Sequence, residues 1–493
     1  MTAEAIMAVE HVEARQGAYA DSVTLMQVSR RVAAADGVSA ALVAMGTPLN
    51  LDLLDGMGFA TPAGAGPNDL VIALRAEDAA AIAGALTEVA DALAARPGGG
   101  DGPVAALPPR TVGMAAREAG AALALISVPG QHAFTEAMDA LDAGCNVMIF
   151  SDNVPVEQEI RLKDVASDRG LLVLGPDCGT AVVGGIGLGF AHTVAPGPVG
   201  IVAASGTGAQ QVLCLLDAAG VGVTAALGVG GRDLSAAVGG RSTLAALDVL
   251  DRDPATEQIL VISKPPADEV AATVRAHADR LGTPVQFALL GPGQPDLTAA
   301  TEELLRALKV DVPQWPHWPG REVAPRRGAL VGLFAGGTLC DEAMLIAGER
   351  FGPIASNIPL QPQWRVDPRA EWDGRHVLLD FGDDELTAGR PHPMIDPSLR
   401  LERLAAYGTD PRTAVLLLDV VLGHGAHPDP AAELAPVIAE LGGPAVVVSL
   451  IGAKADPQDL SAQAAALRGA GAHVYVSNAA AARFACDLIG STS

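Results

Sequence analysis

Three glycine-rich turns combine the residue types that hold an anion, and each follows a short apolar run. Glycine permits positive φ angles, so successive backbone N–H groups converge, and a helix that begins there adds its positive dipole end. The first turn is neither a Walker A loop nor a GxGxxG fingerprint. The pattern predicts phosphate binding, with a tight strand-to-helix connection as the alternative. The turns are Ser205-Gly206-Thr207-Gly208, Gly228-Val229-Gly230-Gly231 and Gly336-Gly337-Thr338.

Two cations accompany these turns. Arg232 directly follows the second turn, and its planar guanidinium suits a phosphate or a carboxylate. Lys264 ends the apolar run ILVIS before a rigid Pro-Pro pair, where its ammonium would neutralise an anion. We predict both as catalytic residues. The alternatives are an ion pair with Asp233 or another acid on a loop for Arg232 and a solvated loop position for Lys264.

The densest polar cluster is DFGDDELTAGRPHPMIDP, residues 380–397, which follows an apolar strand. Its histidine, His392, is a candidate for polarising a substrate, and its acids Asp380, Asp383 and Asp384 are candidates for holding Mg²⁺. The alternative is an exposed acidic loop. We expect no metal site elsewhere, because the HxxH pair at 424–427 has no third ligand nearby.

Polar residues also follow two earlier apolar runs. Since ligands bind beyond the carboxyl ends of parallel strands, these positions are predicted to contact a ligand. Cys178 is a conceivable nucleophile, but no particular histidine can be assigned to it, and a buried thiol is the alternative. The predicted residues are Ser151, Asp152, Asn153, Asp177 and Cys178.

The elements that position these residues predict an α/β protein. Short apolar strands alternate with helices after residue 110, which is typical of doubly wound parallel sheets. The first hundred residues show helix, strand, strand, helix, typical of a ferredoxin-like α+β domain, and end at the linker RPGGGDGP. The last two blocks each open with a strand, a glycine-rich turn and a helix, which indicates a duplicated flavodoxin-like domain. The predicted domains are 1–98 (α+β), 110–195 (Rossmann-like, truncated), 196–315 and 325–493 (flavodoxin-like), with a Pro-rich linker at 312–328.

Composition excludes several classes of protein. The formal net charge of −25 disfavours nucleic-acid binding, which needs clustered Lys and Arg. No apolar run reaches the roughly 18 residues of a membrane-spanning helix, and the first residues do not resemble a signal peptide. The five cysteines are far apart without a CxxC pair, so neither a disulfide framework nor structural zinc is expected. We expect a cytoplasmic protein that binds neither nucleic acid nor membranes.

The motifs together resemble the FdrA family over nearly the whole chain. They include FSDNVPVEQEIRLKDVASDRGLLVLGPDCGT, GIVAASGTG, GVGGRDLS, ISKPP, GLFAGGTLCDEAML and DDELTAGRPHPMIDP. FdrA proteins are relatives of succinyl-CoA synthetase and the NDP-forming acyl-CoA synthetases. The resemblance implies a CoA-binding Rossmann domain before flavodoxin-like ligase domains. It also implies a phosphate-binding role for the Ser-Gly-Thr turn at Ser205 and leaves CoA as the cofactor to consider.

The chain departs from the ligases in four ways. The loop GPGQPD, residues 291–296, has no counterpart of the ligases' phosphorylated histidine, and Lys264 stands where they have a glutamate. The first strand and glycine-rich CoA loop of the Rossmann domain are absent, and no ATP-grasp segment is present. The FdrA family includes a subunit of oxamate carbamoyltransferase, which handles carbamoyl phosphate in purine (allantoin) degradation. The resemblance therefore implies a carbamoyl- or acyl-phosphate transferase subunit.

Two alternatives stay open: an NDP-forming acyl-CoA ligase subunit and a non-catalytic scaffold or regulatory subunit. The expected ligand is a small anion, namely phosphate or an acyl or carbamoyl phosphate. The expected assembly is a hetero-oligomer with operon-encoded subunits, or a homodimer.

Overall fold

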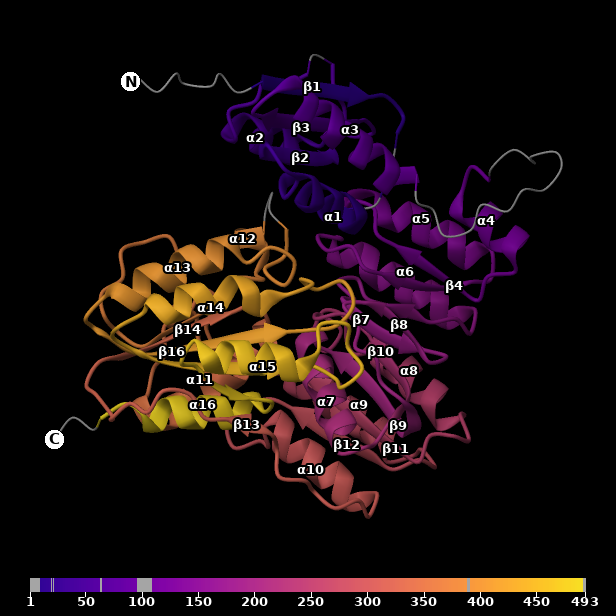
Figure 1. Ribbon diagram of the computed structural model, residues 1–493. Helices are drawn as coiled ribbons and strands as arrows, with labels where there is room; N and C mark the ends of the chain where they lie inside the picture. Colours follow the sequence, from indigo (N-terminus) through magenta and orange to yellow (C-terminus); the bar gives the residue numbers. More distant parts are fainter. Residues whose placement is uncertain are drawn as a thin grey trace. The chain divides into compact units, whose positions relative to one another are not determined.

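The computed structural model describes residues 9–18, 20, 22–62, 64–94, 109–387 and 391–490 (Figure 1). The chain forms two compact units, which are described separately. The first comprises residues 1–109 and 388–391, and the second comprises residues 110–387 and 392–493.

The first unit is an antiparallel sheet in the order β1-β3-β2, covered by helices. Its central strand alternates: Ile72 and Leu74 pack with α1 and α3, whereas Val71 and Ala73 pack with α2 on the other face. The predicted α+β fold is confirmed. We missed β1 and α2, which the helix–strand–strand–helix pattern did not include. The elements are β1 Val9–Arg15, α1 Ser22–Ala33, β2 Val38–Met45, α2 Pro48–Gly56, β3 Leu70–Ala76 and α3 Ala79–Ala94.

The second unit begins with a small parallel sheet in the order β4-β5-β6. Small residues on α5, Ala133, Ala137 and Ala140, are fully buried and let the helix lie close to the apolar strands. This sheet is the truncated Rossmann-like part of the predicted fold. Its elements are α4 Val112–Ala119, β4 Leu123–Ile126, α5 Gly130–Asp142, β5 Asn146–Ile149, α6 Val156–Asp168 and β6 Val173–Leu174.

The next sheet has the order β12-β11-β9-β10-β7-β8. Its four parallel strands β9 to β12 follow the flavodoxin-like order 2-1-3-4. The antiparallel hairpin β7–β8, which we did not predict, pairs with β10, although residues 180–189 fall inside our 110–195 range. The elements are β7 Thr180–Val183, β8 Ile186–Gly189, β9 Pro196–Ala204, α7 Gly206–Ala218, β10 Val223–Gly228, α8 Arg241–Asp251, β11 Gln258–Ser263, α9 Asp268–Ala278, β12 Val285–Leu289 and α10 Leu297–Ala307.

The last sheet has the order β13-β18-β17-β16-β14-β15. Strands β14 to β18 are parallel in the complete flavodoxin-like order 2-1-3-4-5, so the two sheets repeat one scaffold. Strand β13 lies inside the segment that we predicted as a linker, where it pairs antiparallel with β18. The elements are β13 His317–Trp318, β14 Ala329–Phe334, α11 Gly337–Phe351, a 3₁₀ turn Pro362–Trp364, β15 Val377–Asp380, α12 Asp384–Thr387, α13 Ser398–Thr409, β16 Thr413–Val421, α14 Pro430–Glu440, β17 Ala445–Ile451, α15 Leu460–Gly469, β18 His473–Tyr475 and α16 Asn478–Asp487.

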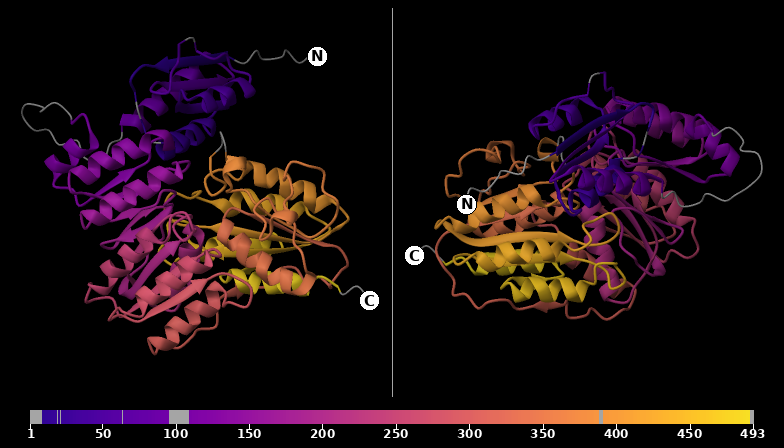
Figure 2. Two further views of the ribbon diagram at one scale, coloured as in Figure 1. Left: turned by 180° about the vertical axis from the view of Figure 1, so that it is seen from behind. Right: turned by 45° about the horizontal axis from the view of Figure 1, so that its top comes forward.

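The two flavodoxin-like sheets lie side by side in the second unit, with their carboxyl edges toward each other (Figures 1 and 2). Helices α7 and α11, each the first helix of its block, contact each other at this junction. Within the described residues, no helix has the length and apolar character needed to cross a membrane.

Candidate functional site

The N-termini of α7 and α11 meet, and this brings two of the predicted turns together. Ser205 caps α7: its hydroxyl oxygen accepts a hydrogen bond from the Gly208 N–H at 2.9 Å. The same hydroxyl donates to Oγ1 of Thr338, in the first turn of α11, at 2.7 Å. Both side chains are buried. Turns 133 residues apart in sequence therefore form one structure, which we call the junction site.

Glycine is required where the two helices touch. A Cβ on Gly336 would lie 2.6 Å from Cγ2 of Thr207, closer than two carbon atoms can approach. The Gly336 N–H donates to Asp419 at 2.9 Å, and the Ala335 N–H donates to the same carboxylate at 2.7 Å. Arg400 completes this buried group with a 2.7 Å ion pair to Asp419. The carboxylate thus fixes the turn that leads into α11.

Four backbone N–H groups at the junction site are available to a ligand. The first N–H groups of a helix have no partner within the helix. Among the described residues, no acceptor is found for the N–H groups of Gly206 and Thr207 in α7 or of Gly337 and Thr338 in α11. Because both helix dipoles also present their positive ends here, the arrangement suits an anion.

Lys264, at the end of β11, supplies the cation. Its Nζ lies 2.9 Å from the position that a Cβ would take on Gly337, and Oδ2 of Asp380 lies 2.8 Å from the same point. Burial opposes the charged ammonium, but the carboxylates of Asp341 and Asp380 outweigh this and raise the pKa of Lys264. The ammonium is therefore charged at neutral pH and faces the N-terminus of α11.

Asp380 and His392 lie near the same two glycine-rich turns and add an acid and a ring to the junction site. Burial raises the pKa of Asp380 to about 7, although Lys264 opposes the rise. A Cβ on Gly382 would lie 2.8 Å from Nε2 of His392 and 3.2 Å from Oδ1 of Asp380. Nδ1 of His392 accepts from the Met394 N–H at 3.2 Å, and burial lowers the pKa of His392 to about 4. The neutral ring therefore carries its proton on Nε2, which makes it a hydrogen-bond donor on the Asp380 side.

Arg232 has partners of its own. Its guanidinium lies 2.9 Å from Oε2 of Glu159 and donates to the carbonyl of Val154 at 2.7 Å. Behind it, the buried Lys163 pairs with Glu159 and Asp233, both at 2.7 Å. Arg232 therefore has an ion-pair partner, as the alternative expected, but the acid is Glu159 of α6 and not Asp233. These contacts tie α6 to the 228–235 corner. A ligand contact for Arg232 stays a prediction.

The turn around Cys178 packs against that same corner. A Cβ on Gly230 would lie 2.4 Å from the carbonyl oxygen of Pro176, and one on Gly231 would lie 3.6 Å from Oδ2 of Asp177. Cys178 is buried, and burial raises the pKa of its thiol to about 12. The thiol is therefore protonated at neutral pH, which argues against a nucleophile.

Three predicted residues follow β5. The hydroxyl of Ser151 turns inward and donates to the carbonyl of Val128, whereas Asp152 and Asn153 are exposed. A Cβ on Gly130 would lie 2.1 Å from the carbonyl oxygen of Asp152, so this loop covers the start of α5. Ligand contacts of these three residues stay predictions.

The predicted Mg²⁺ residues do not gather into a ligand set in the described part of the chain. No group of three His, Cys, Asp or Glu side chains there is suited to a metal, and the Asp384 side chain lies outside that part. Arg390, from the same acidic loop, also lies outside it. Magnesium binding stays a prediction.

Three residues of the junction site were missed from the sequence. Asp341 lies four residues after Gly337 on α11, and Asp419 and Arg400 hold the third turn. The one available signal was an acid inside the otherwise apolar run AVLLLDVV. A buried acid needs a partner, and that partner is only found in three dimensions.

Two family matches cover different parts of the chain. Residues 333–488 match the CoA-ligase family, and residues 7–106 match a family described as "AllF, heavy metal-associated domain". Residues 7–106 contain one histidine, His11, and no cysteine, so they do not fit a heavy-metal site.

The relatives include an uncharacterized protein and CoA-ligase subunits. The chain is 39% identical over 446 residues to the Escherichia coli (strain K12) protein YahF, which is described as uncharacterized, and covers 86% of both chains. It is 31% identical over 160 residues to a succinate–CoA ligase [ADP-forming] alpha subunit of Aquifex aeolicus, covering 31% of this chain and 51% of that one. The chain thus spans about half the length of that ligase subunit.

A solved structure also resembles the chain weakly. The dinucleotide-forming acetyl-coenzyme A synthetase 1 of Ca. Korarchaeum cryptofilum is 16% identical over 74% of this chain and 82% of its own, with a TM-score of 0.25. So low a TM-score supports neither a ligand nor a reaction. The sequence relatives and the CoA-ligase domain make this a succinyl-CoA-ligase-like protein.

Proposed function

Since the chain belongs to the family of Escherichia coli YahF and contains a CoA-ligase domain, we propose that it is a subunit of an enzyme that forms or consumes an acyl phosphate. The observation that carries the proposal is the junction site, where two helix N-termini face Lys264. The phosphate would accept hydrogen bonds from the four available N–H groups. Lys264 would neutralise the charge that develops on the phosphate as the acyl group leaves.

The first candidate reaction is NDP-forming ligation of an acid to CoA. The named relatives favour it, since they include alpha subunits of succinate–CoA ligase and malate–CoA ligase. The proposed CoA contacts are Ser151, Asp152 and Asn153, because they follow a parallel strand of the Rossmann-like sheet. CoA would supply the thiol that accepts the acyl group.

The second candidate is carbamoyl transfer between phosphate and an amide acceptor, such as oxamate. It is favoured by the 291–296 loop, which has no histidine to carry a phosphoryl group. His392 does not replace it well, because its Nδ1 accepts a hydrogen bond and its Nε2 carries the proton. In either reaction, His392 would donate a hydrogen bond from Nε2. The proposed assembly is a hetero-oligomer with operon-encoded subunits, or a homodimer.

The first test is calorimetric titration with inorganic phosphate. Lys264→Met should weaken binding about 10- to 100-fold, because a charge-assisted contact is lost. The matched control is Lys309→Met, at an exposed lysine in the turn after α10. No binding by the unaltered chain, or equal affinities for chain and variant, would overturn the proposed phosphate site.

The second test separates the reactions. The chain, with and without its operon partners, is assayed for acyl-CoA formation from CoA and ATP and for phosphate-dependent breakdown of oxalurate. Turnover in the first assay alone would exclude carbamoyl transfer, and turnover in the second alone would exclude ligation. A chain that binds phosphate but is inactive in both assays with all partners would favour the non-catalytic scaffold.

A further inference from the structure

The junction site presents a hydrogen-bond acceptor as well as donors. Asp380, at the end of β15, is only 5% exposed, and its two carboxylate oxygens have different surroundings. Oδ1 accepts the Gly382 N–H at 2.9 Å, whereas Oδ2 accepts no hydrogen bond from any residue that the structure describes. Oδ2 is directed at the first turn of α11, since it lies 2.8 Å from the position that a Cβ would take on Gly337. Such an oxygen favours a ligand that donates a hydrogen bond.

A gap separates this oxygen from the Lys264 ammonium. Nζ of Lys264 lies 2.9 Å from the same Cβ position on Gly337. The two atoms are therefore at most about 6 Å apart, which is roughly two hydrogen-bond lengths. They nevertheless form no ion pair, which would bring them within 4.0 Å of each other. One ligand oxygen fits between them, where it can accept a hydrogen bond from Nζ and donate one to Oδ2 of Asp380.

The charges around the gap disfavour an oxyanion that has no proton to donate. Three carboxylates act on the charge of Lys264, namely those of Asp341, Asp380 and Asp177. Asp341 is buried as well and accepts no hydrogen bond from the part of the chain that the structure describes. Like charges repel more strongly where water is excluded. An oxyanion is therefore stabilised here when one of its O–H groups donates a charge-assisted hydrogen bond to a carboxylate.

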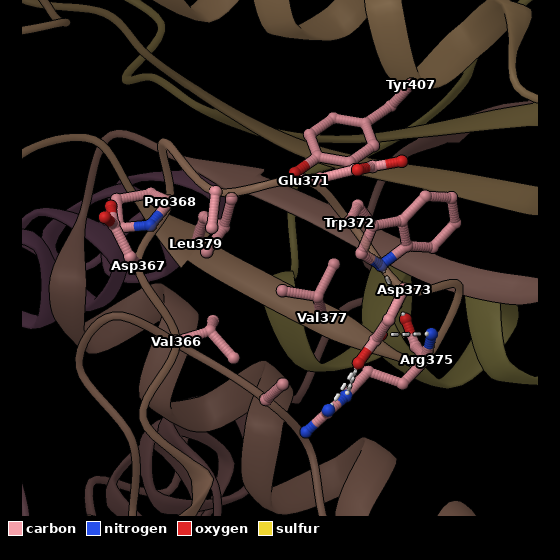
Figure 3. A pocket seen from close by; sticks show the side chains of 12 residues that line it. Val366, Asp367, Pro368, Glu371, Trp372, Asp373, Arg375, Val377, Leu379 and Tyr407 are labelled. Atoms are coloured by element: carbon pink, nitrogen blue, oxygen red, sulfur yellow. Dashed lines mark hydrogen bonds and ion pairs between the residues drawn. The ribbon is translucent and has the colours of Figure 1, made fainter.

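The cavity beside β15 does not offer this combination (Figure 3). Arg375 is the only basic residue among those that line the cavity, and it donates its Nε–H to Asp373 at 2.6 Å. Trp372, on the same lining, donates its indole N–H to the carbonyl of Arg375 at 2.9 Å. An anion in that cavity would therefore meet no unpaired cation on the lining, so the junction site is the better place for an oxyanion.

We propose that the junction site selects oxyanions that keep an O–H, such as hydrogen phosphate, and rejects fully deprotonated ones, such as sulfate. The oxygen that bears the proton lies between Lys264 and Asp380. The other oxygens accept hydrogen bonds from the available N–H groups of α7 and α11. The proposal rests on the proposed function, because it concerns the same site. It narrows the ligand from any tetrahedral anion to one that also donates a hydrogen bond.

The test compares inorganic phosphate with sulfate by calorimetric titration at pH 8. Both are then mainly tetrahedral dianions, and they differ by the one proton that phosphate keeps. We expect phosphate to bind at least about 100-fold more tightly, because sulfate would leave the buried acceptor without a hydrogen bond. Arsenate, which also keeps one O–H at this pH, should bind within about 10-fold of phosphate.

Asp380→Asn should remove the selectivity. The amide oxygen can accept the Gly382 N–H as Oδ1 does, which places the amide nitrogen, a donor, on the Gly337 side. Sulfate affinity should then rise about 10-fold and phosphate affinity should fall about 10-fold, as expected for one hydrogen bond gained or lost. The control is Glu349→Gln, at an exposed acid on α11, which should change neither affinity.

The outcomes separate this proposal from the proposed function. Binding of neither ion would overturn the phosphate site itself, and the selectivity with it. Phosphate and sulfate affinities within about threefold of each other would overturn the selectivity alone and leave the phosphate site in place. Unchanged selectivity in a folded Asp380→Asn would do the same. The comparison of the two ions on the unaltered chain needs no variant, so it decides the question even if Asp380→Asn does not fold.

Discussion

The two flavodoxin-like blocks share a strand order but differ in what they place at the carboxyl edge. The β9–β12 block offers a hydroxyl cap, Ser205, and a lysine, Lys264. The β14–β18 block offers no side-chain cap on α11 but three buried acids, Asp341, Asp380 and Asp419. The two copies of the scaffold therefore differ in what their side chains supply. We call the β9–β12 block, with its hydroxyl and lysine, the donor half, and the β14–β18 block, with its buried carboxyls, the acidic half.

The acidic half depends most on its buried ion pair, which gives the largest expected effect. Asp419→Ala would leave Arg400 buried and two turn N–H groups without an acceptor. We expect a loss of about 3–5 kcal/mol in the free energy of unfolding, measured by denaturant titration. The control is Asp410→Ala, which breaks the Arg412 pair on an exposed side chain and should cost under about 1 kcal/mol. Similar losses in both variants would contradict this role.

The contact between α11 and α10, which joins the two blocks, should stabilise the protein less as pH rises. Glu342 on α11 accepts the Leu297 N–H of α10, in the other block, at 2.7 Å. Burial raises the pKa of Glu342 to about 7, so between about pH 4 and pH 7 the native state keeps a proton that the unfolded chain has released.

Stability from this group is therefore fully present below the unfolded pKa and is lost as pH rises to about 7. Glu342→Gln should remove about 1–3 kcal/mol of this pH dependence, read from unfolding curves between pH 5 and pH 8. Glu349→Gln, at an exposed site on the same helix, should leave the dependence unchanged. An unaltered slope in Glu342→Gln would show that the carboxyl is ionised throughout.

A single added methyl group should disrupt the contact between α7 and α11. Gly336→Ala places a Cβ against Thr207 and should destabilise the protein by about 1–3 kcal/mol while weakening phosphate binding. Gly348→Ala, on α11 with open space around it, should instead stabilise by about 0.5–1 kcal/mol. The difference between the free energies of unfolding of the two variants, from denaturant titration, measures the contact between α7 and α11. Equal effects would mean that the helices do not touch in solution.

The hydroxyl pair that joins the halves should give the smallest effect. A double-mutant cycle of Ser205→Ala and Thr338→Val should show a coupling of about 0.5–1.5 kcal/mol, the usual net value of one hydrogen bond. Ser205→Ala alone should also cost about 1 kcal/mol through the lost helix cap. Additive single effects would indicate that the two hydroxyls are independent.

Local patterns were sufficient for most of the fold. The apolar runs and helical periods located the parallel strands and their helices, because burial on both faces leaves a continuous apolar signature. The β7–β8 hairpin and β13 were missed because they are short, and β13 lies in a proline-rich segment. Pairing with a sheet edge, rather than local preference, makes them strands.

The sequence by itself determined the turns of the junction site. The hydroxyl cap at Ser205 follows from a local strand-to-helix connection, whereas glycine at Gly336 is required by its contact with Thr207 of the other block. Only the tertiary structure decided that the two turns meet, that Lys264 and Asp380 face one glycine, and that Arg232 pairs with Glu159. These contacts join residues far apart in the chain. Charge and burial at such contacts depend on packing, which no single stretch of sequence encodes.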